Sequence, residues 1–266
     1  MNMNYQEICL ATCQVAREAG AFIRSEVEGL RVRNVEVKGL HNFVTEVDKR
    51  SESLIVSRLR QILPQAGFIA EEGTGVRSED QYNWVIDPLD GTTNFIHGLP
   101  PYSVSIALMS GQEVVVGVVY EVSLDECFYA WKGGAAFLNE RPIQVSTRST
   151  VDDSLIATGF PYYDYNQLQP YMACLEYLLR HSHGVRRLGS AAADLAYVAC
   201  GRFEAFYEYG LNPWDVAAGA LIVQCAGGVV TDFGGGPGYV FGKELVAAAA
   251  TVHPEFLSLV KRYMKP

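Results

Sequence analysis

Two carboxylates lie three residues apart, Asp87 and Asp90, directly after the apolar run at 84–86. Pro88 between them fixes φ and removes one backbone N–H. A glycine and two threonines follow at 91–93, and the glycine lets the backbone turn. Carboxylate, carbonyl and hydroxyl oxygens are the ligands that Mg²⁺ takes in proteins. The stretch therefore predicts a divalent-metal site, and the N–H groups that open the next helix can bind a phosphate.

Two further acids stand at the ends of apolar runs. Glu71 follows the run at 68–70, and Asp215 closes the sequence Asn-Pro-Trp-Asp at 212–215. Sites gather at such strand and helix ends in α/β folds. Structural interpretations stay open for each acid taken alone: a solvated acidic loop for Glu71, a first-turn acid favoured by the helix dipole for Asp215, and a polar turn with helix caps for the stretch at 87–95.

Elements that must position these acids alternate along the chain. Helical spacing of apolar residues predicts helices over 8–23 and 48–63, with a loop at 38–42 between them. A short strand at 68–70 leads to Glu71. Strand patterns at 104–108, 114–120, 127–131 and 135–138, separated by turn residues, predict an antiparallel meander.

After residue 145 the pattern changes to alternating strands and helices, which is typical of α/β folds. Strands are predicted at 155–158, 203–209, 229–231 and 246–249, and helices at 167–180, 191–200, 213–226 and 254–261. We place a subdomain boundary in the polar segment at 146–153. This gives residues 1–148 as an N-terminal α+β subdomain with an antiparallel sheet and the main metal site. Residues 149–266 form a C-terminal α/β subdomain that contributes Asp215 and substrate contacts.

Composition limits the function classes. The chain has 266 residues, 49% hydrophobic, with a formal net charge of −9. An acidic chain is a poor candidate for a broad nucleic-acid surface, so we expect no nucleic-acid partner. An acidic protein that binds a phosphate ester needs local compensation, which bound cations supply. The six cysteines form no CxxC pair and sit mostly among apolar neighbours, which indicates buried thiols of a reducing compartment.

The N-terminal residues 1–5 show neither a basic segment nor an apolar stretch of the signal-peptide kind. No uninterrupted apolar stretch reaches the length of a membrane span. We therefore expect a cytoplasmic protein without a membrane span.

These motifs together resemble the inositol monophosphatase family of Mg²⁺-dependent, lithium-sensitive phosphatases. The resemblance rests on the stretches at 68–72, 84–95, 189–192 and 213–219, and on 38–48 as a mobile loop, in family order and at family-like spacing. It implies a layered αβαβα sandwich and a homodimer. The tyrosine-rich segment at 162–165 is a candidate interface or site-rim segment, with a plain surface loop as the alternative.

The resemblance also implies the ligands of two or three Mg²⁺ ions. The first ion would be held by Glu71, Asp87 and the carbonyl of Leu89. The second would be held by Asp87, Asp90 and Asp215. A weaker third ion would involve Glu71 and waters, with Asp48 and the loop residue Lys38 nearby.

Catalytic and substrate residues follow from the same resemblance. Thr92, aided by Glu71, would orient the attacking water. Substrate contacts would come from Asp87, Gly91, Thr92, Thr93, Ser190, Ala191, Glu208 and Asp215. Nucleotide 3′-phosphatases of the superfamily commonly carry a lysine and an acid where this chain has Thr93 and Asn94, which favours the inositol-phosphate branch.

The implied reaction is Mg²⁺-dependent hydrolysis of an inositol monophosphate, such as myo-inositol 1-phosphate, to inositol and phosphate by activated water. Two alternatives stay open. One is a phosphatase for another small ester, a nucleotide 3′,5′-bisphosphate or fructose 1,6-bisphosphate. The other is a catalytically silent protein that binds metal or anion in a regulatory role.

Overall fold

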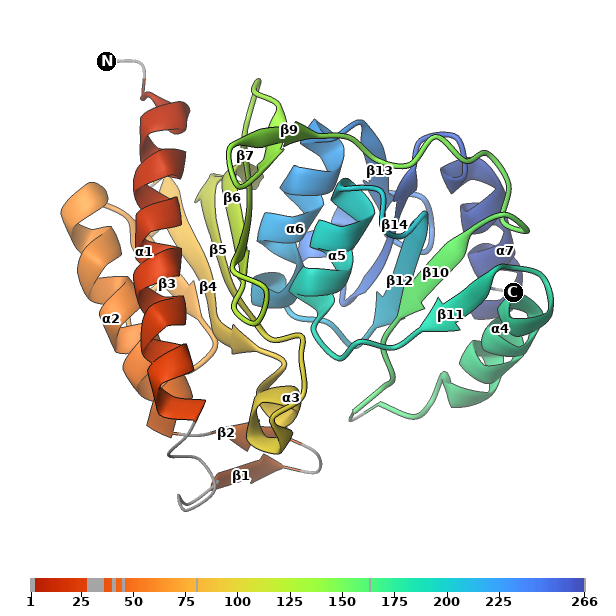
Figure 1. The fold of residues 1–266 in the computed structure, drawn as a ribbon, viewed down its shortest axis with the longest axis horizontal. Helices are drawn as coiled ribbons and strands as arrows, with labels where there is room; N and C mark the ends of the chain where they lie inside the picture. The colour runs from red at the N-terminus through yellow and green to blue at the C-terminus, as the bar shows by residue number, and fades with distance from the viewer. Residues whose placement is uncertain are drawn as a thin grey trace.

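A computed structural model describes residues 3–27, 36–39, 42–44, 46–79, 81–162 and 164–265, with the backbone alone for 36–39 and 42–44. Two sheets and three helical layers alternate, so the αβαβα sandwich implied by the resemblance is confirmed (Figure 1). The outer layers are the pair α1 (Tyr5–Glu26) and α2 (Glu46–Ile62), and the pair α4 (Leu168–Arg180) and α7 (His253–Met264). The middle layer holds α5 (Ala191–Ala199) and α6 (Pro213–Cys225).

The first sheet has seven strands in the order β3-β4-β5-β6-β7-β8-β9. Only β3 and β4 run parallel; from β4 onward every neighbouring pair is antiparallel, as the meander predicted. Its strands are β3 (Gly67–Ala70), β4 (Tyr82–Asp90), β5 (Ser103–Ser110), β6 (Glu113–Glu121), β7 (Glu126–Trp131), β8 (Ala136–Leu138) and β9 (Arg141–Ile143).

The second sheet is mixed and has the order β11-β10-β12-β14-β13. Parallel pairing joins β10 to β11 and β12, whereas β14 runs antiparallel to both of its neighbours. Its strands are β10 (Leu155–Thr158), β11 (Gly184–Arg186), β12 (Ala205–Tyr209), β13 (Gly228–Thr231) and β14 (Glu244–Ala249), and the 3₁₀ turn η2 (Gly238–Val240) precedes β14.

The loop predicted at 38–42 is partly wrong. Residues 36–39 form β1 (Glu36–Gly39), which pairs antiparallel with β2 (Asn42–Val44) in a two-stranded sheet near α3 (Thr92–His97) (Figure 1). Such short strands carry no readable alternation of apolar residues, so only the turn chemistry was visible in the sequence. Residues 40, 41 and 45 of the predicted mobile loop lie outside the described residues.

Helix α6 is apolar on all sides because it lies between two layers. Its residues 216–223 are buried, which is the pattern of a fully enclosed helix. Glycines allow the close approach: a Cβ on Gly117 of β6 would lie 2.6 Å from the Ala218 carbonyl oxygen, and one on Gly219 would lie 2.5 Å from Leu195 Cβ. One apolar core joins α5 and α6 to both sheets, through Val85 and Ala107 on one side and through residues of β12 and β14 on the other.

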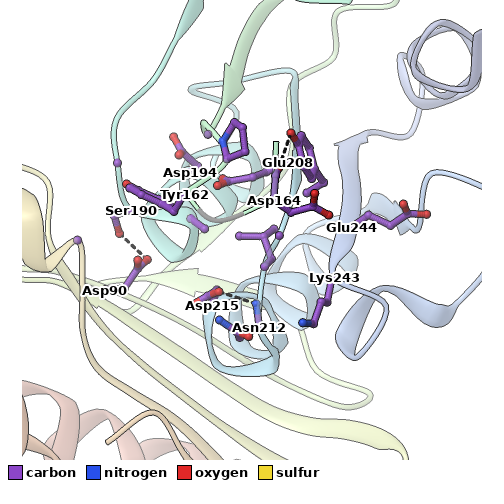
Figure 2. Close-up of a pocket in the computed structure, with 18 of the residues that line it drawn as sticks. Asp90, Tyr162, Asp164, Ser190, Asp194, Glu208, Asn212, Asp215, Lys243 and Glu244 are labelled. Carbon is purple, nitrogen blue, oxygen red and sulfur yellow. Dashed lines mark hydrogen bonds between the residues drawn. The ribbon is translucent and has the colours of Figure 1, made fainter. Parts of the chain in front are cut away.

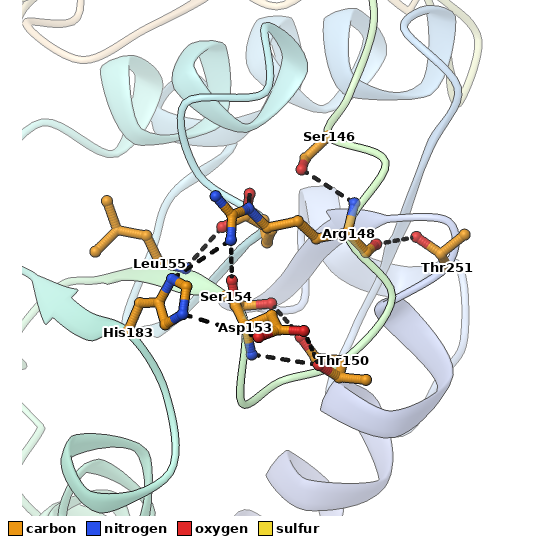
Figure 3. Close-up of polar contacts among 9 residues, drawn as sticks. Ser146, Arg148, Thr150, Asp153, Ser154, Leu155, His183 and Thr251 are labelled. Carbon is orange, nitrogen blue, oxygen red and sulfur yellow. Dashed lines mark hydrogen bonds and ion pairs between the residues drawn. The ribbon is translucent and has the colours of Figure 1, made fainter.

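The polar segment at 146–153 is held against the second sheet through Arg148 (Figure 3). The Arg148 Nη1 donates to the Asp153 carbonyl oxygen at 2.9 Å, and its Nε lies 3.3 Å from the buried carboxylate of Glu204. Glu204 also accepts from the Leu155 N–H at 2.6 Å, and Thr251 donates to the Arg148 carbonyl. The segment where we placed the subdomain boundary is thus joined by side chains to the start of β10.

Candidate active site

The metal motif lies where β4 ends and α3 begins. Asp87 is buried, and its Oδ1 accepts the Leu89 N–H at 2.9 Å. The pairing of β4 with β5 shifts register between Asp87 and Asp90, so the strand bends within the motif. Gly91 then takes φ +93°, a left-handed conformation that favours glycine, and caps the short helix α3.

Thr92 joins this turn to α2. Its hydroxyl lies 3.0 Å from the carbonyl oxygen of Leu89 and 3.0 Å from Oδ1 of the buried Asp48. Asp48 therefore lies beside the predicted catalytic threonine. Lys38 lies in β1, where the side chains are outside the described part of the structure.

Asp90 connects the motif to the middle helical layer. Its Oδ2 accepts a hydrogen bond from the Ser190 hydroxyl at 2.7 Å (Figure 2). It accepts another from the Ala192 N–H at 2.7 Å. Ser190 is the N-cap of α5 and is buried. The N-terminal end of α5 thus faces the first sheet across the motif.

Asp215 comes to the same place from α6. Its Oδ2 accepts the Asn212 N–H at 2.6 Å in a capping box, with a proline in the first turn. The first-turn role left open for Asp215 is therefore real, and it coexists with a position on the cleft wall (Figure 2). A helix cap fixes the carboxylate direction, which suits a ligand as well as a cap.

Glu71 ends β3 and is positioned through its neighbours. Its N–H donates to the Ile86 carbonyl at 3.2 Å. The buried Glu52 of α2 accepts the N–H groups of Glu72 and Thr74, each at 2.7 Å. The turn after β3 is thus held by a buried carboxylate, and Glu71 lines the same cleft as Asp90 and Asp215.

The acids of the motif disfavour one another's charge. Burial raises the pKa of Asp87 well above its usual range, and the nearby acids raise it further: Glu71, Asp90 and Asp215. Burial likewise raises the pKa of Asp215 well above its usual range, with the charge of Asp90 adding to the rise. Burial raises the pKa of Asp90 to about 6. The hydrogen bond from Ser190 lowers this pKa and so offsets part of the effect of burial.

This donor set fits a hard divalent cation by its chemistry. Within the described parts of the chain, no three His, Cys, Asp or Glu side chains are already gathered as a metal-holding group. Glu71, Asp90 and Asp215 nevertheless line one cleft, and the buried Asp87 interacts electrostatically with all three. These acids offer only oxygen and carry mutual repulsion that a cation removes. The residues present therefore fit Mg²⁺.

The cleft has a volume of about 310 Å³ and extends from the motif to the C-terminal sheet. It brings together the other predicted substrate residues: Gly91, Thr92, Thr93, Ser190, Ala191 and Glu208. Glu208 of β12 is buried, and a Cβ on Gly159 would lie 2.0 Å from its carboxyl group. Tyr162 and Asp164 also line the cleft, which favours the site-rim interpretation of this segment; Tyr163 lies outside the described residues.

Sequence reasoning missed several cleft residues, and three of them carry polar side chains of particular interest: Gln167, Arg187 and Asp194. Arg187 lies over the rings of Phe160 and Tyr162, with its guanidinium carbon 5.4 and 5.5 Å from the ring centroids. Asp194 of α5 is buried, and Gln167 is the N-cap of α4. In the sequence, Arg187 is only the second residue of the short basic pair at 186–187. A lone acid within an otherwise apolar helix was the available signal for Asp194.

The Glu208 carboxyl predicts a pH dependence of folding stability. Burial raises its pKa from 4.5 to about 8, partly offset by Arg187. Between these values the unfolded chain releases a proton that the folded protein keeps, so stability present below pH 4.5 is lost as the pH rises toward about 8. Urea unfolding in EDTA should show Glu208→Gln gaining stability over the wild type across this window. If the free energy of unfolding changed with pH by the same amount in the wild type and in Glu208→Gln, the prediction would be wrong.

Comparisons with known proteins agree with this geometry. The sequence model described as "Inositol monophosphatase family" matches residues 4–265. This chain belongs to the inositol monophosphatase family. It is 39% identical to an inositol-1-monophosphatase of Mesorhizobium japonicum over 250 residues, 94% of each chain. It is 41% identical to a Nus factor SuhB of Pseudomonas aeruginosa over 258 residues, 95% of each chain.

A solved relative confirms the family fold. The crystal structure of extragenic suppressor protein suhB from Bartonella henselae matches with a TM-score of 0.92 and 38% identity, over 96% of this chain and 99% of that one. Family members are phosphatases of the Mg²⁺-dependent kind, in agreement with the acidic cleft. Among the described helices of this member, none is long and apolar enough to cross a bilayer.

Proposed function

We propose that this protein is a Mg²⁺-dependent phosphomonoesterase that hydrolyses an inositol monophosphate to inositol and phosphate. The observation that carries the proposal is the position of Asp90, where β4 meets the N-terminal end of α5 and faces Asp215 of α6. Glu71, Asp90 and Asp215 come from three separate parts of the fold and line one cleft, and the buried Asp87 interacts electrostatically with all three. The hydrogen bonds that Asp90 and Asp215 accept at two helix starts do not account for this concentration of acids, because buried like charges destabilise a fold.

Within this proposal, Glu71, Asp87 and the Leu89 carbonyl hold one Mg²⁺, and Asp87, Asp90 and Asp215 hold a second. Glu71, with Asp48 and the Lys38 loop nearby, takes part in a weaker third site. When bound, Mg²⁺ neutralises phosphoryl oxygens, stabilises the leaving alkoxide and lowers the pKa of water. The cleft residues do the remaining work: Gly91, Thr92 and Thr93 bind phosphate oxygens through N–H and hydroxyl groups.

Thr92 orients the attacking water, and Glu71 accepts a proton from it. The Thr92 hydroxyl is already held by Asp48 and the Leu89 carbonyl, which limits its rotation. Thr92→Ala should therefore lower kcat more than it raises KM. If the residue served only as a helix-start residue, stability would fall by about 1 kcal/mol and kinetics would hardly change. Comparing kcat with Tm for the variant decides between the two roles.

The alcohol half of the ester faces Glu208, Asp215 and the segment at 190–191. Glu208 lies in the cleft beyond the motif, where it meets ring hydroxyls. Phosphate release from inositol 1-phosphate, a nucleotide 3′,5′-bisphosphate and fructose 1,6-bisphosphate, with and without Mg²⁺, tests the substrate. Faster phosphate release from either bisphosphate than from inositol 1-phosphate would show that the inositol ester is not the preferred substrate. No release from any ester would favour a silent metal- or anion-binding protein.

Inhibition by lithium is part of the proposal. Li⁺ should compete for the second Mg²⁺ position, formed by Asp87, Asp90 and Asp215, and slow product release. Initial rates at saturating Mg²⁺ should fall in the presence of LiCl but not of equal KCl. Identical rates in the two salts would remove lithium sensitivity and leave the hydrolase proposal intact.

A second function is supported by the relatives named Nus factor SuhB, which include an Escherichia coli protein 43% identical over 235 residues. We propose that this chain also has a Nus-factor role. Complementation of an E. coli strain lacking its SuhB tests this. Rescue by both the wild type and Asp215→Asn supports the role, and failure of both contradicts it.

The protein is further proposed to act in the cytoplasm as a homodimer whose sites are each built from one chain. All the acids discussed come from a single chain, so association would adjust activity and not create it. Light scattering should give twice the 29.3 kDa of one chain. A monomer mass at micromolar protein would contradict the dimer.

A further inference from the structure

Three buried polar atoms on the cleft wall find no hydrogen-bond partner among the described residues. They are Gln167 Oε1, Arg187 Nε and Asp194 Oδ1. Leaving such atoms unpaired costs stability, so a group in the cleft that could pair with them would be favoured. None belongs to the metal motif.

Asp194 is the most deeply placed of the three. This residue is 1% exposed, although it belongs to the lining of the cleft together with Glu208 (Figure 2). Arg187 lies near enough to interact with the Asp194 carboxyl electrostatically. The Asp194 N–H is used within α5, where it donates to the Ser190 carbonyl at 2.9 Å. Arg187 does not pair with it directly; one of its Nη atoms donates to the Tyr162 hydroxyl instead. Asp194 Oδ1 is therefore left without a partner among the described residues, in a side chain that belongs to the cleft lining.

The chemistry of the three atoms defines the ligand. Two oxygens accept hydrogen bonds and one N–H donates, so the complementary group must both donate and accept. A hydroxyl does so, whether the Asp194 carboxyl is charged or neutral. We propose that Asp194 and Gln167 are specificity-determining residues that bind hydroxyl groups of the alcohol half of the substrate, which makes the cleft selective for polyhydroxylated esters. This inference rests on the proposed function and adds residues to it.

A pair of esters of the same ring size tests the proposal: inositol 1-phosphate and cyclohexyl phosphate, which lacks the ring hydroxyls. Asp194→Ala should lower kcat/KM for the inositol ester by about 10-fold, the worth of one hydrogen bond. It should leave kcat/KM for cyclohexyl phosphate within about 2-fold, because no hydroxyl is there to lose. Gln167→Met, which removes the acceptor at the start of α4, should show the same selective loss if Asp194→Ala fails to fold.

Two controls separate recognition from structure. Asp194→Asn keeps an oxygen acceptor and should restore most of the discrimination, whereas Glu176→Gln, an exposed change on α4, should affect neither ester. Equal losses on both esters in the Asp194 and Gln167 variants, or no loss on either, would overturn the proposal.

Saturation-transfer NMR with myo-inositol gives a readout without turnover. Contact of wild-type protein with myo-inositol should weaken in Asp194→Ala. If the wild type hydrolyses neither ester but shows this loss, hydroxyl recognition stands and the proposed function fails. If it hydrolyses both esters and the variants neither discriminate nor lose myo-inositol contact, the proposed function stands and this inference fails.

Discussion

Phosphate release from inositol 1-phosphate should stop in EDTA and return with excess Mg²⁺. The reason is the set of oxygen ligands, where Asp90 and Asp215 raise the pKa of Asp87, Asp90 raises that of Asp215, and a bound cation would relieve both. A phosphate dianion that approaches these acids without bound cations would meet like charge. The measurement is initial rate against free Mg²⁺ after EDTA treatment and buffer exchange.

Ca²⁺ is the informative comparison in this experiment. It takes the same oxygen ligands but is larger and accepts looser geometry, so it should bind and support turnover poorly. Full activity in EDTA would refute metal-dependent hydrolysis by this cleft. Equal rates in Ca²⁺ and Mg²⁺ would show that the geometry around Asp90 and Asp215 does not select between the two ions.

Asp215→Asn should reduce kcat by about 100-fold or more, and Asp90→Asn should do the same. Either change keeps the side-chain shape but removes one charge from the second proposed ion, which is asked to supply several kcal/mol at the leaving oxygen. At 1.36 kcal/mol per decade, even half of that contribution approaches 100-fold. Steady-state kinetics at saturating Mg²⁺ measure the loss.

Folding of both variants should survive, because removing one charge relieves repulsion among the acids. The Asn212 N–H can still donate to the amide oxygen at position 215, so the capping box loses little. Asp152→Asn, an exposed acid outside the cleft, is the matched control and should keep wild-type kcat. Near-normal kcat for Asp215→Asn at saturating Mg²⁺ would show that Asp215 is not a ligand.

Local signals in the sequence were sufficient for most elements. Helices α1, α2 and α6 follow from apolar periodicity or from a capped apolar run, and the meander follows from strands separated by turns. The motif at 87–95 predicted the end of a strand followed by a helix. In the structure β4 ends at Asp90 and the short helix α3 follows. Strands β9 and β11, each of three residues, were missed because so short a segment shows no period.

Contacts between distant elements could not be predicted from local pattern. The Asp90 carboxylate is held by Ser190 and Ala192, a hundred positions further along the chain, and only the family resemblance placed Ser190 near the site. Asp194 was missed because its helix looks like plain core. Its significance appears only when the cleft and the unpaired oxygen are seen together.

The enclosed position of α6 limits how this protein can be recombined with its relatives. The helix belongs to the C-terminal half, yet its body packs on strands of the N-terminal sheet through Gly117 and the backbone at Ala218. A chimera that joins two relatives near residue 148 would therefore pack α6 of one parent against the N-terminal sheet of the other. Parents that differ at this contact should yield poorly folded hybrids, and the helix would carry Asp215 out of register with Asp87. Exchange between relatives is thus expected to succeed at surface loops sooner than at the apparent boundary between the two sheets.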